Sequence, residues 1–227
     1  MDTAPKALIF DVNETLLDLS PLKATIGKAL GGKPELTKTW FTMLLQYSLV
    51  HTTADQFERF GKIGVACLKM LAENESISLS DQDARKAVAP IRELPPHPDV
   101  PEALHLLHKA GYKMYPFTNG GYRAIREQVK HASIEQYFTD CFSVEGVGLF
   151  KPHTHAYRWL AQQIKTPVED CMMIAAHGWD VSGAIWAGMR GIFLARPGQQ
   201  AYPLGPQPEL VTPTLMEAAQ ALVMLKS

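Results

Sequence analysis

Ala7-Leu8-Ile9-Phe10-Asp11-Val12-Asn13-Glu14-Thr15-Leu16 is the stretch of sequence that decides the fold. Its first four residues form a short, continuous apolar run, which is typical of a parallel strand buried on both faces. The run ends at Asp11, and the sequence then turns polar. A buried strand that opens into a polar loop predicts a carboxylate held rigidly at the edge of a sheet.

An apolar run followed by a polar switch recurs three times further along the chain. The segments are Tyr112–Phe117 before Thr118-Asn119-Gly120-Gly121, Cys171–Ala176 before His177-Gly178-Trp179-Asp180, and Gly191–Ala195 before Arg196-Pro197-Gly198. Helical patterns lie between them, over Val100–Ala110, Tyr157–Ile164 and Val181–Gly188. Strands that alternate with helices indicate a Rossmann-like α/β core, with a parallel sheet covered on both faces. Because ligands bind beyond the carboxyl ends of such strands, we expect all four polar switches at one edge of the sheet.

Residues 21–94 interrupt this alternation. Helical patterns cover Trp40–Val50, Ala54–Ala72 and Ser80–Ala89, and Ser80 followed by Asp83 predicts an N-terminal helix cap. The stiff run Pro95-Pro96-His97-Pro98 then closes the segment, since it cannot continue a helix. We therefore expect an α/β core made of residues 1–18 and 97–227, with a helical cap domain inserted over residues 19–96.

Composition narrows the class of protein. The 227 residues are 46% hydrophobic and carry a formal net charge of −1, which suits a folded core but offers no basic excess for nucleic acid. Cys67, Cys141 and Cys171 are widely separated and form no metal or redox pair, so we expect reduced thiols in a cytoplasmic protein. No signal-length or membrane-spanning apolar run is evident, and we expect neither a nucleic-acid nor a membrane partner.

Taken singly, the polar residues at the strand ends also fit ordinary structural roles. Asp11 could cap a turn, although carboxylates serve as nucleophiles in several classes of enzyme. Lys151 could simply start a helix, and Tyr157 and Trp179 could fill core space. Thr118-Asn119 could be turn chemistry. Only the combination and the order of these residues along the chain distinguish a catalytic site from these structural roles.

Four ordered motifs resemble those of the haloacid dehalogenase superfamily. They are Asp11-Val12-Asn13-Glu14-Thr15-Leu16, Thr118-Asn119 after a strand, Lys151-Pro152 before a helix, and Trp179-Asp180. The helical insertion lies where that family places its smaller cap domain. The resemblance therefore covers essentially the whole chain and implies a hydrolase.

Within that superfamily the sequence favours a dehalogenase over a phosphatase. Phosphatases typically have a second Asp, acting as general acid and base, where this chain has Asn13. They also generally carry a pair of acids near the fourth motif to hold magnesium, whereas Asp180 is followed by Val181-Ser182-Gly183-Ala184. The chain resembles instead the L-2-haloacid dehalogenases, which need neither metal nor organic cofactor. In that family an Asp displaces halide from C2 with inversion, and water hydrolyses the resulting ester to a 2-hydroxy acid.

The resemblance implies a role for each matching residue. The implied catalytic residues are the nucleophile Asp11, the supporting hydroxyl of Thr15, Thr118 in place of the usual serine, the ammonium of Lys151, and Asp180 to orient or activate water. The implied substrate-binding positions are Asn119, Phe41, Tyr157, His177 and Trp179. The resemblance also implies a small-molecule substrate, no metal and no cofactor, and it allows a homodimer.

The cap departs from the family pattern at the substrate site. Dehalogenases have an arginine after a tryptophan in the first cap helix, which binds the substrate carboxylate and the leaving halide, but here Phe41 follows Trp40. Losing such a charge-assisted contact could cost on the order of 1.5–3 kcal/mol. Arg59 and Lys62 are candidate substitutes, although exposed helix charges often form just a solvated face. We expect retained hydrolytic machinery with an altered halide and carboxylate pocket.

The fourth motif departs as well, because Ala175 replaces a common serine and His177 a common asparagine. His177 fits either a polar group that titrates near neutral pH or a histidine bonded to neighbouring backbone. A phosphatase acting on a small phosphate ester and an inert binding protein on the same scaffold remain the alternative functions.

Overall fold

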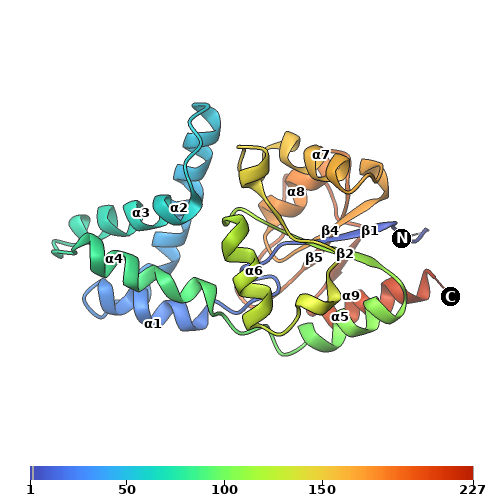
Figure 1. The fold of residues 1–227 in the computed structure, drawn as a ribbon, viewed down its shortest axis with the longest axis horizontal. Coiled ribbons are helices and arrows are strands. Elements are labelled where there is room, and N and C mark those ends of the chain that lie inside the picture. Colours follow the sequence, from blue (N-terminus) through green and yellow to red (C-terminus); the bar gives the residue numbers. More distant parts are fainter. Residues whose placement is uncertain (2, 227) are drawn as a thin grey trace.

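A parallel sheet forms the centre of the larger part of the molecule, in a computed structural model that describes residues 1 and 3–226 (Figure 1). The strand order among the described residues is β3-β2-β1-β4-β5-β6, and every neighbouring pair is parallel. The strands are β1 (Ala7–Phe10), β2 (Lys113–Thr118), β3 (Phe142–Ser143), β4 (Cys171–Ala175), β5 (Arg190–Leu194) and β6 (Leu210–Thr212). This order reverses direction beside β1, which is where open α/β sheets bind ligands.

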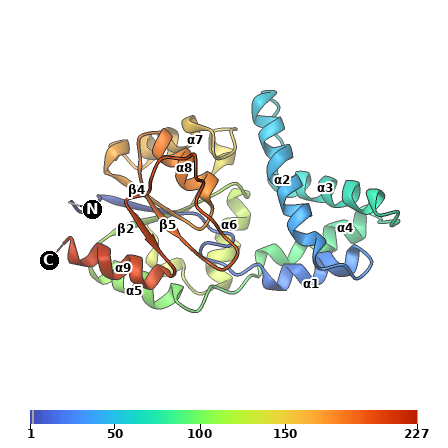
Figure 2. The ribbon, with the colours of Figure 1, turned by 180° about the vertical axis from the view of Figure 1, so that it is seen from behind.

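Helices cover both faces of this sheet. They are α5 (Val100–Lys109), α6 (Tyr122–His131), α7 (Thr154–Gln163), α8 (Gly178–Trp186) and α9 (Leu215–Met224). Helices α7 and α8 lie on one side and α5 and α9 on the other, as both views show (Figures 1 and 2). The expected Rossmann-like α/β core is therefore confirmed.

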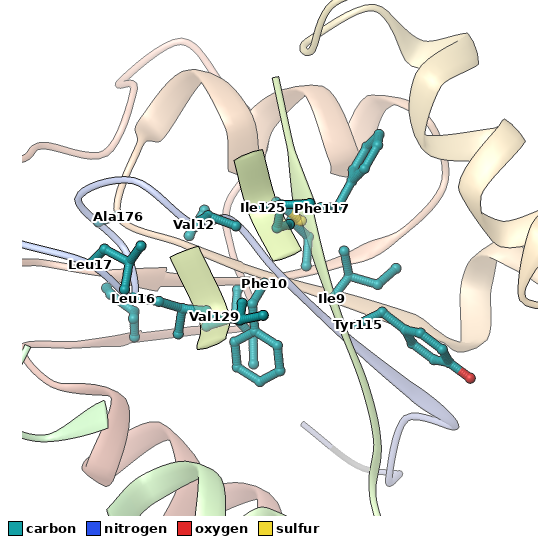
Figure 3. Packing of buried hydrophobic residues seen from close by; sticks show 14 of the residues in the cluster. Ile9, Phe10, Val12, Leu16, Leu17, Tyr115, Phe117, Ile125, Val129 and Ala176 are labelled. Carbon is teal, nitrogen blue, oxygen red and sulfur yellow. The ribbon is translucent and has the colours of Figure 1, made fainter. Parts of the chain in front are cut away.

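Strand β1 is completely buried because it lies between β2 and β4 in the middle of the sheet. All four of its residues are fully buried, and Phe10 meets Phe138 edge to face with 6.1 Å between ring centroids. Figure 3 shows Ile9 and Phe10 within the buried cluster that also contains Ile125 and Val129 of α6. Each such side chain contributes roughly 1.5–3 kcal/mol through burial, so the strand holds the residue that follows it rigidly.

A second group of helices stands beside the sheet (Figures 1 and 2). It consists of α1 (Ser20–Ala29), α2 (Leu36–Thr53), α3 (Phe60–Asn74), α4 (Asp81–Val88) and the 3-10 turn η1 (Ala89–Arg92). Its two connections to the core run together, because the Asp18 N–H donates to the Pro95 carbonyl and the His97 N–H to the Leu16 carbonyl, each at 2.9 Å. We propose residues 19–96 as the limits of this cap.

The structure confirms most of the expected elements and corrects one. The expected strands are present with shifts of at most one residue at each end, and the Asp83 N–H donates to Ser80 Oγ at 3.1 Å as the capping pattern predicts. The helix expected from Ala54 is wrong at its start. Asp55 has a φ of 53°, in the left-handed region that ends a helix, so α3 begins only at Phe60.

None of the helices among residues 1 and 3–226 is both long enough and apolar enough to cross a membrane. The three cysteines are buried and unpaired.

Candidate active site

Asp11 lies at the end of β1, where three of the polar switches meet. Its N–H donates to the Ile174 carbonyl of β4 at 3.1 Å, and the residue is only 5% exposed. Thr118 ends the neighbouring strand β2, and His177 follows β4. In the fourth segment, Arg196 Nε donates to the Thr15 carbonyl at 2.9 Å, so the predicted gathering of all four segments at one edge of the sheet is confirmed.

The ammonium of Lys151 lies between two buried carboxylates. Its Nζ is 2.9 Å from Asp11 Oδ1, 2.6 Å from Asp180 Oδ2 and 3.0 Å from the carbonyl oxygen of Phe117. These three acceptors use all three protons of the ammonium. The backbone of Lys151 is fixed by Asn119, whose Oδ1 accepts the Lys151 N–H at 2.9 Å and whose Nδ2 donates to the Lys151 carbonyl at 3.4 Å. Asn119 thus positions the lysine.

The second carboxylate oxygen of Asp11 has two partners of its own. Thr15 Oγ1 donates to Oδ2 at 2.7 Å, and His177 Nδ1 lies 3.0 Å from the same oxygen. The Ala176 N–H donates to Thr15 Oγ1 at 3.0 Å, which leaves the hydroxyl proton directed at Asp11. Since a carboxylate oxygen has about two lone-pair sites, Oδ2 is saturated while Oδ1 keeps one site free.

These contacts keep Asp11 ionised. Burial by itself would raise the pKa of its carboxyl, but the charge of Lys151 and the hydrogen bond with His177 outweigh burial and hold that pKa well below its usual range. Burial would likewise lower the pKa of Lys151, yet the charges of Asp11 and Asp180 raise it above 10.5. The site therefore presents an ionised carboxylate beside a fixed positive charge.

Asp180 is fully buried behind the lysine. Tyr157 Oη donates to its Oδ1 at 2.5 Å, while Lys151 occupies its Oδ2. Burial raises the pKa of Asp180 against the opposing charge of Lys151, so this carboxylate is more basic than an exposed one. Burial and the charge of Asp180 raise the pKa of Tyr157 well above 10, so the phenol stays protonated as a donor.

His177 packs between two aromatic rings beside Asp11. Its ring stacks on Trp179 with a centroid separation of 5.1 Å and on Phe41 of the cap helix α2 at 6.1 Å. Its Nε2 lies 2.9 Å from Glu14 Oε2, so each imidazole nitrogen faces a carboxylate. Although burial alone would lower its pKa, the hydrogen bonds to Asp11 and Glu14 raise the pKa of His177 to about 9.

The donor set does not fit a divalent cation. Lys151 already occupies the space between Asp11 and Asp180, and the Asn13 amide oxygen accepts a hydrogen bond from Gln128 Nε2 at 3.0 Å. Within residues 1 and 3–226, no three His, Cys, Asp or Glu side chains are grouped in a way that could hold a metal ion. A hard cation needs several oxygen ligands, and here an ammonium neutralises the carboxylates.

Some predicted site residues have contacts different from those expected. Thr118 Oγ1 accepts the Gly120 N–H at 2.9 Å, so the structure supports a turn role for this hydroxyl, and its catalytic role stays a prediction. Of the candidate substitute cations, Arg59 is exposed and lies 3.9 Å from Glu145, and Lys62 pairs with Glu58 at 3.1 Å. Neither pairs with the Asp11 carboxylate.

Sequence reasoning assigned no role to two residues that the structure joins to the site. Glu14 lies inside the first motif and binds His177, and Gln128 of α6 holds Asn13. The position of Glu14 in the first motif, three residues after Asp11, was a signal that its side chain lies at the site. Gln128 offered none, because it is one polar residue on a surface helix.

Comparison with known proteins agrees with this geometry. Residues 5–188 match the family described as haloacid dehalogenase-like hydrolase. Haloacetate dehalogenase H-2 of Moraxella sp. (strain B) is 24% identical over 211 residues, which cover 92% of this chain and 94% of that protein. The (S)-2-haloacid dehalogenase of Pseudomonas fluorescens is 24% identical over 216 residues, 95% of each chain.

The fold is shared with the structure of L-2-haloacid dehalogenase from Xanthobacter autotrophicus with chloropropionic acid covalently bound. The TM-score is 0.90 at 20% identity, and the likeness covers 96% of this chain and 98% of that one. Because the family match spans most of the sequence and includes the buried Asp11–Lys151–Asp180 cluster, the chain belongs to the haloacid dehalogenase-like hydrolases.

Proposed function

We propose that this protein is a metal-independent (S)-2-haloacid dehalogenase in which Asp11 is the nucleophile. The observation that carries the proposal is the Lys151 ammonium fixed between the carboxylates of Asp11 and Asp180. That arrangement keeps the Asp11 carboxylate ionised, and the ammonium of Lys151 balances its charge without a metal ion. The similarity to haloacid dehalogenases over nearly the full chain supports the same activity.

The first step is a displacement at C2 of a 2-haloalkanoic acid. Asp11 Oδ1 carries the free lone pair, because Lys151 occupies only one of its sites while Oδ2 accepts from Thr15 and His177. An Oδ1–C2 bond forms as the carbon–halogen bond breaks, and halide leaves with the bonding pair. No leaving group needs a proton, which fits the presence of Asn13 where a second acid would otherwise lie.

The second step hydrolyses the ester. Water attacks Asp11 Cγ and gives up a proton to Asp180, whose burial makes it a better base. The tetrahedral intermediate then collapses, the Cγ–Oδ1 bond breaks, and Lys151 donates a proton to Oδ1 of the departing 2-hydroxy acid. The proton held by Asp180 returns to Lys151 across their 2.6 Å contact. The second proton of the water stays on the new oxygen of the Asp11 carboxyl group and passes to solvent, because Lys151 and His177 hold the pKa of that carboxyl well below its usual range, and this restores the starting carboxylate.

The binding of the substrate carboxylate and halide differs from that in the dehalogenases it resembles. Phe41 supplies no charge, and its ring packs on His177. Arg59 and Lys62 are exposed and lie beside Glu145 and Glu58. We propose a small 2-haloacid as substrate, bound more weakly through its carboxylate than in an arginine-containing site.

A substrate panel tests this function. Purified wild-type protein is assayed for halide release from fluoroacetate, chloroacetate and both enantiomers of 2-chloropropionate, and for phosphate release from p-nitrophenyl phosphate with and without magnesium. We expect metal-independent halide release that is abolished in Asp11→Asn and retained in Asp55→Asn, since Asp55 is exposed and asparagine tolerates its left-handed φ. Mass spectrometry of the quenched reaction should detect an adduct on Asp11.

Two results would overturn the proposal. Magnesium-dependent phosphate release that requires Asp11 would make the protein a phosphatase. Release of neither halide nor phosphate would favour an inert scaffold.

We further propose that the protein acts in the cytoplasm as a homodimer. The three buried, unpaired cysteines suit a reducing compartment. The exposed side chains of Leu49 and Val50 near the end of α2, which rises away from the rest of the cap in Figure 1, offer apolar surface for a second copy. Sedimentation velocity at micromolar protein should show a dimer, and a monomer would contradict this part of the proposal.

A further inference from the structure

We propose that His177, held as an imidazolium by Glu14, joins Thr15 in binding the oxyanion that forms on Asp11 Oδ2 when the ester is hydrolysed. The inference rests on the proposed function, because it assigns a role within the second step of that reaction. It gives a specific chemical task to a histidine that the resemblance implied only as a substrate-binding position, and to a glutamate to which it assigned no role.

The geometry around the imidazole requires two donors. Nδ1 lies 3.0 Å from Asp11 Oδ2, and Nε2 lies 2.9 Å from Glu14 Oε2. A neutral imidazole has only one N–H, so either tautomer would point a nitrogen lone pair at a carboxylate oxygen. Only the doubly protonated ring satisfies both contacts. The raised pKa of His177, about 9, agrees with this protonation state.

The imidazolium is held in place by packing as well as by charge. Phe41 and Trp179 stack on it, and the residue is only 5% exposed. Glu14 adopts a φ of 61°, a left-handed conformation that is uncommon for a residue with a Cβ. Such a conformation persists only where its surroundings hold it, and here it accompanies the contact to His177 Nε2. The donor at Nδ1 is therefore preorganised.

Charge develops at the oxygen that His177 contacts. In the ester, Oδ1 is bonded to substrate and Oδ2 is a neutral carbonyl oxygen. When water attacks Cγ, the π pair of the Cγ–Oδ2 bond moves onto Oδ2 and the water proton passes to Asp180. Thr15 Oγ1 and His177 Nδ1 already donate to Oδ2, so both bonds strengthen as the charge appears and weaken when the carbonyl reforms.

The same geometry excludes a role for His177 as the general base. An imidazolium has no lone pair with which to accept the proton of water. The titratable and charged groups facing the ring are Asp11 and Glu14, from the end of β1 and the loop after it. Helices α2 and α8 present Phe41 and Trp179, which do not titrate. The ester removes the Asp11 charge that helps to raise the pKa of His177, so loss of the His177 proton should slow ester hydrolysis at a pH below about 9.

Rapid-quench burst kinetics, with substrate in excess over protein, separate this role from the nucleophilic step. Wild type, His177→Phe and the exposed-residue control His131→Phe are mixed with 2-chloropropionate, and halide and the Asp11 adduct are followed by rapid quench and mass spectrometry. Phenylalanine keeps the ring between Phe41 and Trp179 but removes the donor. We expect His177→Phe to release about one halide per protein molecule and then stall with the ester accumulated. Its ester hydrolysis should be about 10²–10³-fold slower, the usual effect of losing one oxyanion donor.

A second measurement does not depend on turnover. In ¹⁵N NMR, both ring nitrogens of His177 should be protonated at about pH 8 in the wild type. Glu14→Gln should lower the pKa of His177, whereas the exposed-residue control Glu102→Gln should leave both nitrogens protonated at that pH. A neutral His177 in the wild type at that pH would overturn the inference.

The kinetic outcomes distinguish the inference from the proposed function. If wild type releases halide through Asp11 but His177→Phe hydrolyses its ester at the wild-type rate, the oxyanion role is wrong and the dehalogenase assignment stands. If wild type releases no halide from any 2-haloacid, the proposed function fails and the oxyanion role fails with it.

Discussion

The contact of His177 with two carboxylates should make the stability of the protein depend on pH in a defined direction. The pKa of this histidine is raised from 6.5 to about 9 by its hydrogen bonds to Asp11 and Glu14, against the effect of burial. Below about pH 6.5 the folded and unfolded chains both hold the proton, so the stabilisation is fully present. Between about pH 6.5 and 9 only the folded chain holds it, so the free energy of unfolding falls as pH rises.

The pKa difference sets the size of this effect. About 2.5 pH units at about 1.4 kcal/mol per unit correspond to about 3 kcal/mol of unfolding free energy, lost progressively across the interval. Solvent screening reduces this value little, because His177 is almost fully buried. In a protein of 227 residues, about 3 kcal/mol corresponds to a decrease of about 6–12 °C in melting temperature.

Thermal and urea unfolding across this pH range test the expectation. Wild type and His131→Asn, which changes an exposed histidine at the end of α6, should lose stability together between about pH 6.5 and 9. His177→Asn should be less stable at low pH and show a flatter profile, because asparagine carries no titrating proton. Parallel profiles for wild type and His177→Asn would refute the imidazolium.

Two further changes probe the remaining buried charges. Lys151→Met leaves Asp11 and Asp180 without their cation, and we expect a loss of about 3–5 kcal/mol in the free energy of unfolding in urea near neutral pH. Part of this stability should return on acidification, because one of the carboxylates takes up a proton. The control Lys130→Met changes an exposed residue at the end of α6 and should lose little stability. An equal loss at all pH values would contradict this interpretation. Tyr157→Phe deprives Asp180 of a buried hydrogen-bond donor and should lower the free energy of unfolding by about 1–3 kcal/mol. The control Tyr202→Phe changes an exposed residue and should leave the stability unchanged. An unchanged urea midpoint for Tyr157→Phe would show that this hydrogen bond adds no net stability.

The sequence predicted the central part of the fold because burial leaves a clear pattern there. β1 lies at the expected residues, since a strand buried on both faces must be a continuous apolar run. The short strands β3 and β6 have only two and three residues, too few for any periodicity to show. Helix α6 escaped prediction because it buries few apolar side chains, Ile125 and Val129 among them, beside the polar Gln128.

The site was predictable where a motif fixes both residue type and spacing. Asp11, Lys151 and Asp180 meet as the ordered motifs implied. The link from Glu14 to His177 crosses 163 residues and depends on a left-handed backbone at Glu14, which residue patterns do not encode. The place of Asn119 near substrate stays a prediction, and the two hydrogen bonds from its amide to the backbone of Lys151 could not be foreseen, because motif spacing does not specify contacts between segments.

The most direct test of Asp11 as nucleophile is the origin of the product oxygen. A single turnover with protein in excess over 2-chloropropionate is run in water enriched in ¹⁸O, and both the 2-hydroxy acid and the peptide containing Asp11 are analysed by mass spectrometry. Because Oδ1 leaves with the product and water attacks Cγ, we expect an unlabelled hydroxyl in the product and one ¹⁸O in the Asp11 carboxylate. A labelled hydroxyl in the product, with Asp11 unlabelled, would mean that water attacks C2 directly and would contradict the proposed mechanism.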